Sequence, residues 1–363
     1  MNNRRCSSKK CQSVSAKANK LTNNHSRQIK AIQLLQYPVI FEIRKNQIML
    51  GNQTKLFEFI FLGLSDVPSA GLPLFMLFLL IYLMTLVGNL LILLMIFIDS
   101  HLHTPMYMFL SNLAGLDVFY STVTSPRMLT DFFSETKTIS LPACITQFFF
   151  FFSFICIELY LLAVMSYDRY VAICHPLHYI QIMHPKFCVL IVVSAWVIGF
   201  LTSLIHTLCT LRLTFCGPNL IQGFFCDLPQ LFLLSCTNTF INVLVMFLVG
   251  ILMGSSALGI TFVPYIQIFR TIKKIKTWRG KLKAFSTCAS HLTVVFVFYG
   301  TLIFTYLRPT PRNAFSEDRL VSVVYTIVTP LLNPIIYSLR NKDLKGAFRR
   351  TAHKIGFLRL NTS

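Results

Sequence analysis

The most regular feature of the chain is a series of long apolar stretches separated by short polar connections. A transmembrane helix needs about 20 mostly apolar residues, because it must cross roughly 30 Å of hydrocarbon. Seven stretches meet this requirement, at approximately 73–98, 106–126, 144–168, 187–208, 239–269, 284–306 and 319–339. The second is the least apolar, since Asp117 and several Ser and Thr interrupt it. The pattern predicts an all-α membrane protein: a seven-transmembrane helix bundle with a short amphipathic cytoplasmic helix after the last span.

Composition agrees with this pattern and excludes an ordinary soluble protein. The 363 residues are 54% hydrophobic and 13% charged, and they include 34 Phe; the mean hydropathy is +0.62. Soluble domains are about 25% charged, so this chain would cover a soluble surface with apolar side chains. The net charge of +20 therefore reports membrane topology and contact with the lipid bilayer, and we expect no nucleic-acid partner.

Residues 1–48 differ from the rest, with ten Lys and Arg, one acid and no apolar run of membrane length. They are predicted to be a disordered basic extension, or upstream sequence added by a mis-assigned start before Met49; a tail that binds a partner is the alternative. The remaining chain divides into an extracellular N-terminus (49–72), the seven-transmembrane domain (73–339) and a cytoplasmic tail (340–363).

The distribution of basic residues predicts the orientation in the membrane. The connections between spans 1–2, 3–4 and 5–6, together with the tail, hold 16 Lys and Arg, whereas the opposite side holds 7 when counted from Met49. The positive-inside rule places the N-terminus outside and the C-terminus in the cytoplasm. Asn52-Gln53-Thr54 is then a glycosylation sequon on the outer side, which predicts a glycan at Asn52.

Four cysteines are expected on the outer, oxidising side. Cys216, Cys226 and Cys236 lie in the long connection between spans four and five, and Cys144 opens span three. Four cysteines allow three pairings. Zinc binding is the alternative, but ten-residue gaps do not resemble Cys-x-x-Cys spacing. We therefore expect a disulfide that ties this loop to the outer end of the third helix.

Two acids lie in the middle of apolar spans, where an ionisable group is costly and usually faces the bundle interior. Asp117 is in span two and Glu158 in span three. They could face each other with a sodium ion between them, since two bare carboxylates would repel. The alternative is that each is hydrogen-bonded to Ser, Thr or Asn neighbours and only stabilises packing. No other cofactor is predicted.

The inner end of the third span carries Asp168, Arg169 and Tyr170. The expected resting partner of Arg169 is its neighbour Asp168. A charge-based lock to the sixth helix is not available, because residues 269–285 contain seven basic residues and no acid. The Asp-Arg-Tyr sequence favours a role for Arg169 as a conformational switch over a role as a plain anchor at the membrane interface.

Prolines predict hinges in spans five and seven. Pro330 and Pro334 each remove a backbone hydrogen bond from span seven, and Asn333 is expected to satisfy the freed backbone groups. Tyr337 lies on nearly the same face as Pro334. Pro264 predicts a similar hinge in span five, directly before Tyr265.

Several long motifs resemble the rhodopsin-like G-protein-coupled receptors and, within them, the olfactory receptors of the tetrapod type. They are Gly88-Asn89, LHTPMYMFL at 102–110, MSYDRYVAICHPLHY at 165–179, KAFSTCASHL at 283–292 and PLLNPIIYSLRN at 330–341. The resemblance covers roughly 52–355. It implies an odorant receptor in the plasma membrane that activates a stimulatory heterotrimeric G protein and raises cyclic AMP.

The resemblance also implies the disulfide pairs Cys144–Cys226 and Cys216–Cys236, and it matches Asn52 to the usual N-terminal glycan. Two departures stand out. The family commonly has Ser where Pro264 stands before the tyrosine of the fifth helix, and often has His where Gly223 stands before the FFCD sequence of the outer loop.

A pocket for a small hydrophobic odorant is expected in the outer half of the bundle. Helical spacing places four residues of span three on one stripe, and the resemblance adds residues from spans five, six and seven. The stripe is apolar and carries no charge that would pair with an amine. The predicted lining is Phe148, Phe151, Phe152, Ile155, Val249, Met253, Tyr299, Leu302, Ile303, Tyr306 and Thr326.

Other function classes fit the sequence less well. A transporter would show internal repeats, and no repeat relates the two halves of this chain. An enzyme is not expected, because no metalloprotease, nucleophile-elbow or P-loop motif occurs. A chemosensory receptor that acts outside olfaction stays open as an alternative within the same class.

Overall fold

The structure, a computed structural model, describes residues 58–64, 71–216, 219–307 and 322–354. The basic extension 1–48, Met49, Asn52 and the end of the cytoplasmic tail lie outside these residues.

Seven helical segments correspond to the seven apolar stretches. They are α2 (Gly71–Ile98), α3 (Pro105–Thr130), α4 (Leu141–Cys174), α6 (Pro185–Leu211), α8 (Phe240–Lys274), α9 (Trp278–Leu307), and a seventh segment that joins the π-helical η4 (Val324–Val328) to α11 (Thr329–Arg340). Within the described residues, α2, α4, α6 and α8 are long and apolar enough to cross a membrane by themselves. Asp117 and the hydroxyl residues make α3 less apolar, as the sequence indicated.

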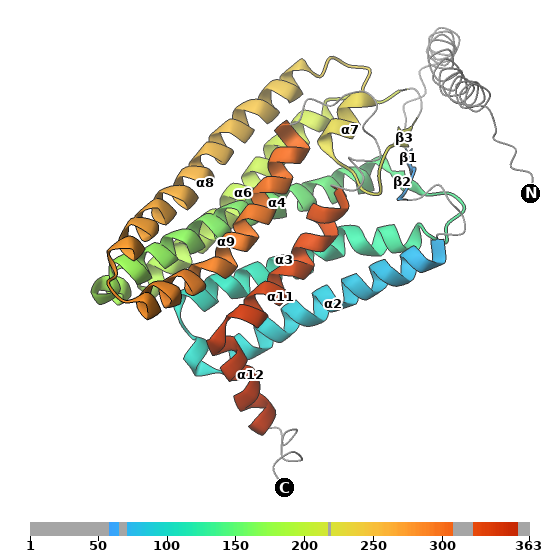
Figure 1. The fold of residues 1–363 in the computed structure, drawn as a ribbon. Coiled ribbons are helices and arrows are strands. Elements are labelled where there is room, and N and C mark those ends of the chain that lie inside the picture. The colour runs from blue at the N-terminus through green and yellow to red at the C-terminus, as the bar shows by residue number, and fades with distance from the viewer. Residues whose placement is uncertain (1–57, 65–70, 217–218, 308–321, 355–363) are drawn as a thin grey trace, which may run out of the picture. The chain divides into compact units, whose positions relative to one another are not determined.

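Helix α4 lies at the centre of the bundle, where it contacts α3, α6, α8 and α9 (Figure 1). Its apolar residues are buried around most of its circumference, because neighbouring helices cover it on several sides. Against α6 the approach is close: a Cβ on Gly199 would come within 3.0 Å of the Ser153 carbonyl oxygen and 3.2 Å of the Ile157 nitrogen. Glycine at this point lets the two backbones approach, as small residues do in membrane bundles.

The proline in the seventh segment determines how α11 meets α2. Pro334 has no N–H, so the carbonyl of Pro330 lacks its helical donor. The side chain of Asn89 on α2 donates to that carbonyl over 3.2 Å. The sequence assigned this role to Asn333, and that prediction was wrong, because the Asn333 side chain bonds the acids of α3 and α4 instead.

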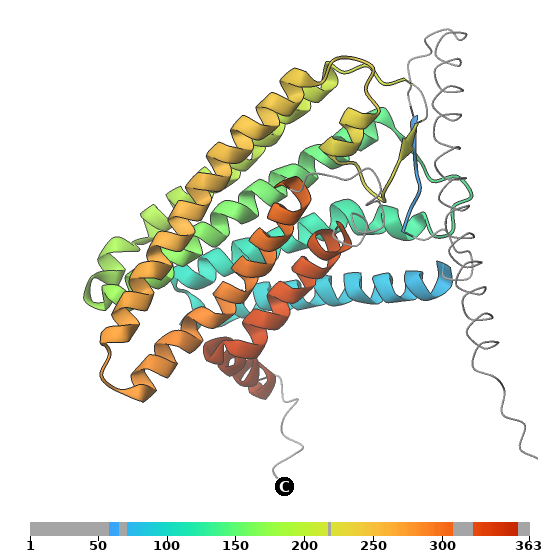
Figure 2. The same cartoon turned by 45° about the horizontal axis from the view of Figure 1, so that its top comes forward.

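A small sheet forms at the end of the bundle where α2 begins (Figure 2). It has the order β2-β1-β3, with β1 (Glu58–Phe61) antiparallel to β2 (Thr138–Ser140) and parallel to β3 (Leu220–Ile221). Phe59 and Phe61 are fully buried, and the Phe59 ring meets Phe215 edge-on at 5.3 Å. The short α7 (Leu228–Leu233) lies in the same outer connection.

The opposite end carries the short connections and α12 (Lys342–Lys354) (Figure 1). Connections there contain η2 (Ser100–Leu102), η3 (Pro176–His178) and α5 (Tyr179–Ile182). The N-terminus of α12 is capped by Asn341, whose side-chain oxygen accepts from the Asp343 and Leu344 amides. Leu344 and Ala347 are buried while Lys345 and Arg349 are exposed, so α12 is the amphipathic helix predicted after the last span.

Candidate functional site

A polar cluster lies inside the apolar bundle, where α3, α4 and α11 meet. The Asn333 amide nitrogen is 3.1 and 3.0 Å from the two carboxylate oxygens of Asp117 and 3.5 Å from Oε1 of Glu158. All three side chains are buried. The two acids therefore share one amide donor from the seventh segment, which is the hydrogen-bonded arrangement that the sequence left open as the alternative.

The side-chain oxygen of Asn333 is buried and has no hydrogen-bond partner among the described residues. Carboxylate and amide oxygens such as those of Asp117, Glu158 and Asn333 are the ligand type that a hard cation prefers. The described residues contain no cluster of three or more His, Cys, Asp or Glu side chains.

A second constellation lies at the α12 end of α4. Arg169 donates from Nε to Oδ2 of Asp168 over 3.0 Å, which is the partner expected from the sequence. Asp168 is fully buried, and its other oxygen accepts from the Tyr179 hydroxyl at 2.7 Å. Burial and the adjacent Asp168 carboxylate raise the pKa of Tyr179 well above its usual range, so its hydroxyl remains a donor. Tyr170 instead bonds Nε2 of His175 at 3.0 Å.

The fifth and sixth helices are joined near the same end by Tyr265 and His291. The Tyr265 hydroxyl is 2.6 Å from Nδ1 of His291, and the rings stack with centroids 5.9 Å apart. His291 is buried, and its Nε2 has no side-chain hydrogen-bond partner. Tyr337 of α11 is also buried with an unpartnered hydroxyl. These groups are positioned to exchange partners when helices move.

Residues predicted to line the pocket lie mainly in the buried core of the outer half. Phe148, Phe151, Ile155, Met253 and Thr326 are buried, while Phe152, Val249 and Leu302 are half-buried against the core. Of the five consecutive phenylalanines, Phe150 is 40% exposed and Phe149 stacks on Phe200, so these two face away from the centre. Tyr299 is buried and bonds Thr261 at 3.1 Å, whereas Ile303 is half exposed on α9. The side chain of Tyr306 lies outside the described residues.

The outer loop is fixed to the bundle by covalent and polar contacts. The structure contains the disulfides Cys144–Cys226 and Cys216–Cys236, with Cα atoms 5.5 and 5.9 Å apart, which are the pairs that the resemblance implies. Gln147 adds hydrogen bonds beside the Cys144–Cys226 disulfide. Its amide nitrogen donates to the Val123 carbonyl at 3.1 Å, and its oxygen accepts from the Cys226 amide at 3.0 Å.

Comparison with known proteins decides the family. The family model described as "Olfactory receptor" matches residues 78–354. The chain belongs to the olfactory receptor family. Human olfactory receptor 5B12 is 48% identical over 85% of this chain and 99% of its own length, and mouse olfactory receptor 5M5 is 49% identical over 83% and 95%. Mouse olfactory receptor 5AR1 is 45% identical over 84% and 98%.

Membership in this family confirms the predictions of the receptor class and of a multi-pass membrane protein. As an olfactory receptor, the chain is a multi-pass plasma-membrane G-protein-coupled receptor and not an enzyme. Three contacts of the candidate site were not predicted from the sequence: His291 with Tyr265, Gln147 with Cys226 at the disulfide, and Tyr179 with Asp168. His291 and Tyr179 do lie in the motifs that carried the resemblance, and Gln147 is an isolated polar residue beside a phenylalanine run. The positions of His291 and Tyr179 in these motifs, and the polar character of Gln147, are the sequence features that point to these contacts.

Proposed function

We propose that this olfactory receptor binds small hydrophobic odorants in the outer half of the bundle and activates a stimulatory heterotrimeric G protein, which raises cyclic AMP. In this proposal the N-terminus is extracellular and the C-terminus cytoplasmic. The observation that carries it is the pairing of Arg169 with Asp168, held in turn by Tyr179 at the α12 end of the bundle.

Activation would be a shift between two populations of the receptor. An odorant must bind the active state better than the resting state, because equal affinity shifts nothing. Phe151 of α4 touches α3, η4 and the outer loop through its ring contacts with Tyr120, Tyr325 and Phe225. A ligand that packs beside Phe151 would alter how these elements meet. At the other end, α9 would move outward as Tyr265 leaves His291 and Arg169 leaves Asp168.

A cyclic AMP reporter assay tests this mechanism. Cells would express the receptor with the stimulatory olfactory G protein and receive an odorant panel, with surface expression measured in parallel. We expect a dose-dependent signal that Arg169→Ala abolishes. The matched control is Arg212→Ala, which removes an exposed arginine at the other end of the bundle and should keep the signal. A signal that persists in Arg169→Ala would contradict the switch, and silence across a broad panel despite surface expression would contradict the coupling.

We further propose that Asp117, Glu158 and the side-chain oxygen of Asn333 hold a sodium ion in the resting receptor. Bound sodium would supply a positive charge between two carboxylates that otherwise share one amide donor. The three residues come from α3, α4 and α11, so they would hold these helices together. When α11 moves, Asn333 would withdraw from both acids.

Sodium dependence of thermal stability tests the cation site. The purified receptor should melt at a higher temperature in sodium chloride than in choline chloride at equal ionic strength. Asp117→Asn and Glu158→Gln should each remove that difference. An equal melting temperature in the two salts for the unmodified receptor would show that hydrogen bonds alone satisfy the acids.

A further inference from the structure

Helix α8 is held against α4 by packing and by polar contacts. The hydroxyls of Ser256 and Tyr160 are 3.0 Å apart, near the middle of α8. Close to the end of α8 at Lys274, the Thr271 hydroxyl lies 3.2 Å from the Cys174 thiol of α4. These contacts fix the second half of α8 to α4, the central helix of the bundle.

Different side chains of α8 contact α9. The Thr261 and Tyr299 hydroxyls are 3.1 Å apart. Nearer the α12 end of the bundle, Tyr265 bonds His291. Thr261 is fully buried, and Tyr299 is buried as well. Because a buried hydroxyl without a partner costs free energy, each of the hydroxyls of Thr261 and Tyr299 depends on the other.

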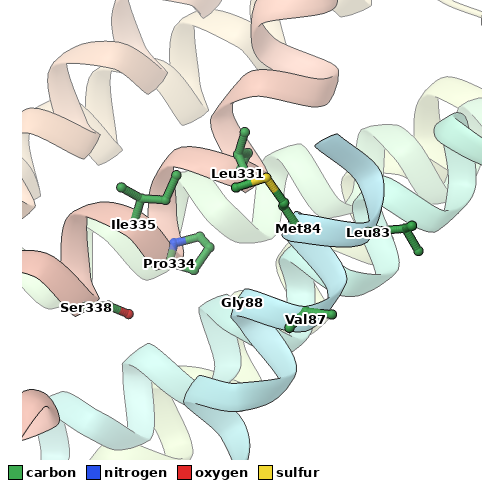
Figure 3. A pocket seen from close by; sticks show the side chains of 8 residues that line it. All are labelled: Leu83, Met84, Val87, Gly88, Leu331, Pro334, Ile335 and Ser338. Atoms are coloured by element: carbon green, nitrogen blue, oxygen red, sulfur yellow. The ribbon is translucent and has the colours of Figure 1, made fainter. Parts of the chain in front are cut away.

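Glycines let other helices of the bundle approach closely, but they do not do so beside this hydroxyl pair. On α2, a Cβ on Gly88 would lie 3.1 Å from Cβ of Pro334, which packs against it in Figure 3. A Cβ on Gly259 of α8 or on Gly300 of α9 would meet nothing within 4 Å. The seventh segment is therefore packed tightly on α2, whereas side chains make the contact between α8 and α9 at this level.

Pro264 lies between the two residues of α8 that contact α9. It has no N–H, so the carbonyl of Ile260 lacks its helical donor and the helix can bend there. Thr261 precedes the proline by about one turn, and Tyr265 follows it directly. A change at Thr261 can therefore reach Tyr265 as a bend of α8 at Pro264.

We propose that Thr261 is a positioning residue that transmits odorant binding from Tyr299 to the contact between Tyr265 and His291. This role rests on the function proposed above, with Tyr299 in the predicted lining of the odorant site. In the resting receptor, the hydrogen bond between Thr261 and Tyr299 holds α9 against α8. An odorant beside Tyr299 displaces its hydroxyl, which breaks this bond and lets His291 move away from Tyr265.

Basal cyclic AMP, measured per receptor at the cell surface, tests this role in the full-length chain. Thr261→Val keeps the shape of the side chain but removes its hydroxyl, and Tyr299→Phe removes the partner. Each variant should raise the basal signal about fivefold, as expected when one neutral hydrogen bond is lost from the resting state alone. A general loss of stability would lower the signal instead, so a rise separates the two explanations.

A double variant and two controls make the test specific to this bond. Thr261→Val combined with Tyr299→Phe should raise the basal signal no further than either change alone, because both remove the same bond. Thr261→Ser keeps the hydroxyl and should keep the basal signal of the unmodified receptor. The matched control is Thr293→Val, which removes an exposed hydroxyl that bonds the Ala289 carbonyl within α9 and should leave the basal signal unchanged.

Two results would overturn the role of Thr261 and leave the proposed function standing. One is an unchanged basal signal in Thr261→Val when the unmodified receptor responds to odorant. The other is a double variant whose effect is the product of the two single effects. An unmodified receptor that reaches the surface but gives neither basal nor odorant-driven cyclic AMP would overturn the coupling itself, and this role with it.

Discussion

Single amide side chains join backbone segments that are distant in this receptor. Asn89 serves the carbonyl that Pro334 frees, Asn333 lies between two acids, and Gln147 bridges α3 and the outer loop. An amide can donate and accept at once, so one buried residue can serve two neighbours. Because a buried backbone group left unpaired costs free energy, these residues should contribute to stability well beyond their size.

The clearest residue-scale prediction concerns Gln147. Gln147→Leu keeps the volume but removes a donor to the Val123 carbonyl and leaves the Cys226 amide without its side-chain acceptor, at a cost of about 1–3 kcal/mol for the unpaired amide. In its protonated form, Gln147→Glu keeps the acceptor for the Cys226 amide and has one O–H donor for the Val123 carbonyl. The melting temperature of the purified receptor should therefore fall most in the leucine variant and less in the glutamate variant. Equal melting temperatures in all three proteins would contradict the bridging role.

At this scale the sequence predicts pairs of side chains that are adjacent in the chain or that share an unusual place in the membrane. Asp168 with Arg169 follows from adjacency, and the convergence of Asp117 with Glu158 follows from their depth in the membrane. The roles of Asn89 and Asn333 were beyond its reach, because either amide can serve a proline-freed carbonyl. Which one does so depends on how α2 and α11 rotate about their axes.

Among the elements, α12 shows how a short helix is attached to the bundle. Arg350 donates through Nε to Oδ2 of Asp99 over 2.9 Å, and Nδ1 of His101 lies 2.9 Å from the other Asp99 oxygen. Tyr107 donates to Asn341, the N-cap of α12, at 2.9 Å. The first inner connection and the start of α3 therefore hold the helix at both ends.

Breaking the ion pair should release the C-terminal half of α12. Asp99→Asn and Arg350→Gln should each increase amide hydrogen exchange over residues 344–351, while the exchanged pair Asp99→Arg with Arg350→Asp should restore protection. The contrary outcome, unchanged exchange in both single variants, would mean that the apolar face alone docks α12.

The same contact has a defined pH dependence. Hydrogen bonds from Arg350, stronger than the opposing effect of burial, lower the pKa of Asp99 from 3.8 to about 2. A carboxylate with a lowered pKa stabilises the folded state above its unfolded pKa, and this contribution is lost as the pH falls through the folded pKa. Protection of α12, corrected for intrinsic exchange rates, should therefore be the same at pH 5 and pH 7.5. A loss of protection between these values would assign the docking to a histidine instead.

The helices could be predicted from the sequence and the outer sheet could not. Each apolar stretch of membrane length became a helix, because in lipid the backbone must satisfy its own hydrogen bonds. The strands β1, β2 and β3 are two to four residues long and come from three separate connections. Their pairing depends on where the helices bring those connections, and no local pattern of such length predicts it.

At the scale of the whole molecule, the human relative is matched over 99% of its length by 85% of this chain. We expect a chain that begins at Met49 to reach the cell surface and respond to odorant as the full-length chain does. Flow cytometry on intact cells, beside the cyclic AMP assay, would measure both. A lower response from the shorter chain would give residues 1–48 a function and exclude the mis-assigned start.

The disulfide that ties the outer loop to α4 also fixes an order in time. Its cysteines are separated by 82 residues, which a ribosome needs roughly 4 to 16 s to add. Cys216 is synthesised before Cys226, so a non-native bond between Cys144 and Cys216 can form first. A chain that forms this bond reaches the native pairing only by exchange through a mixed disulfide. The supply of oxidoreductase in the secretory pathway, rather than the insertion of seven helices, should set how quickly this receptor matures.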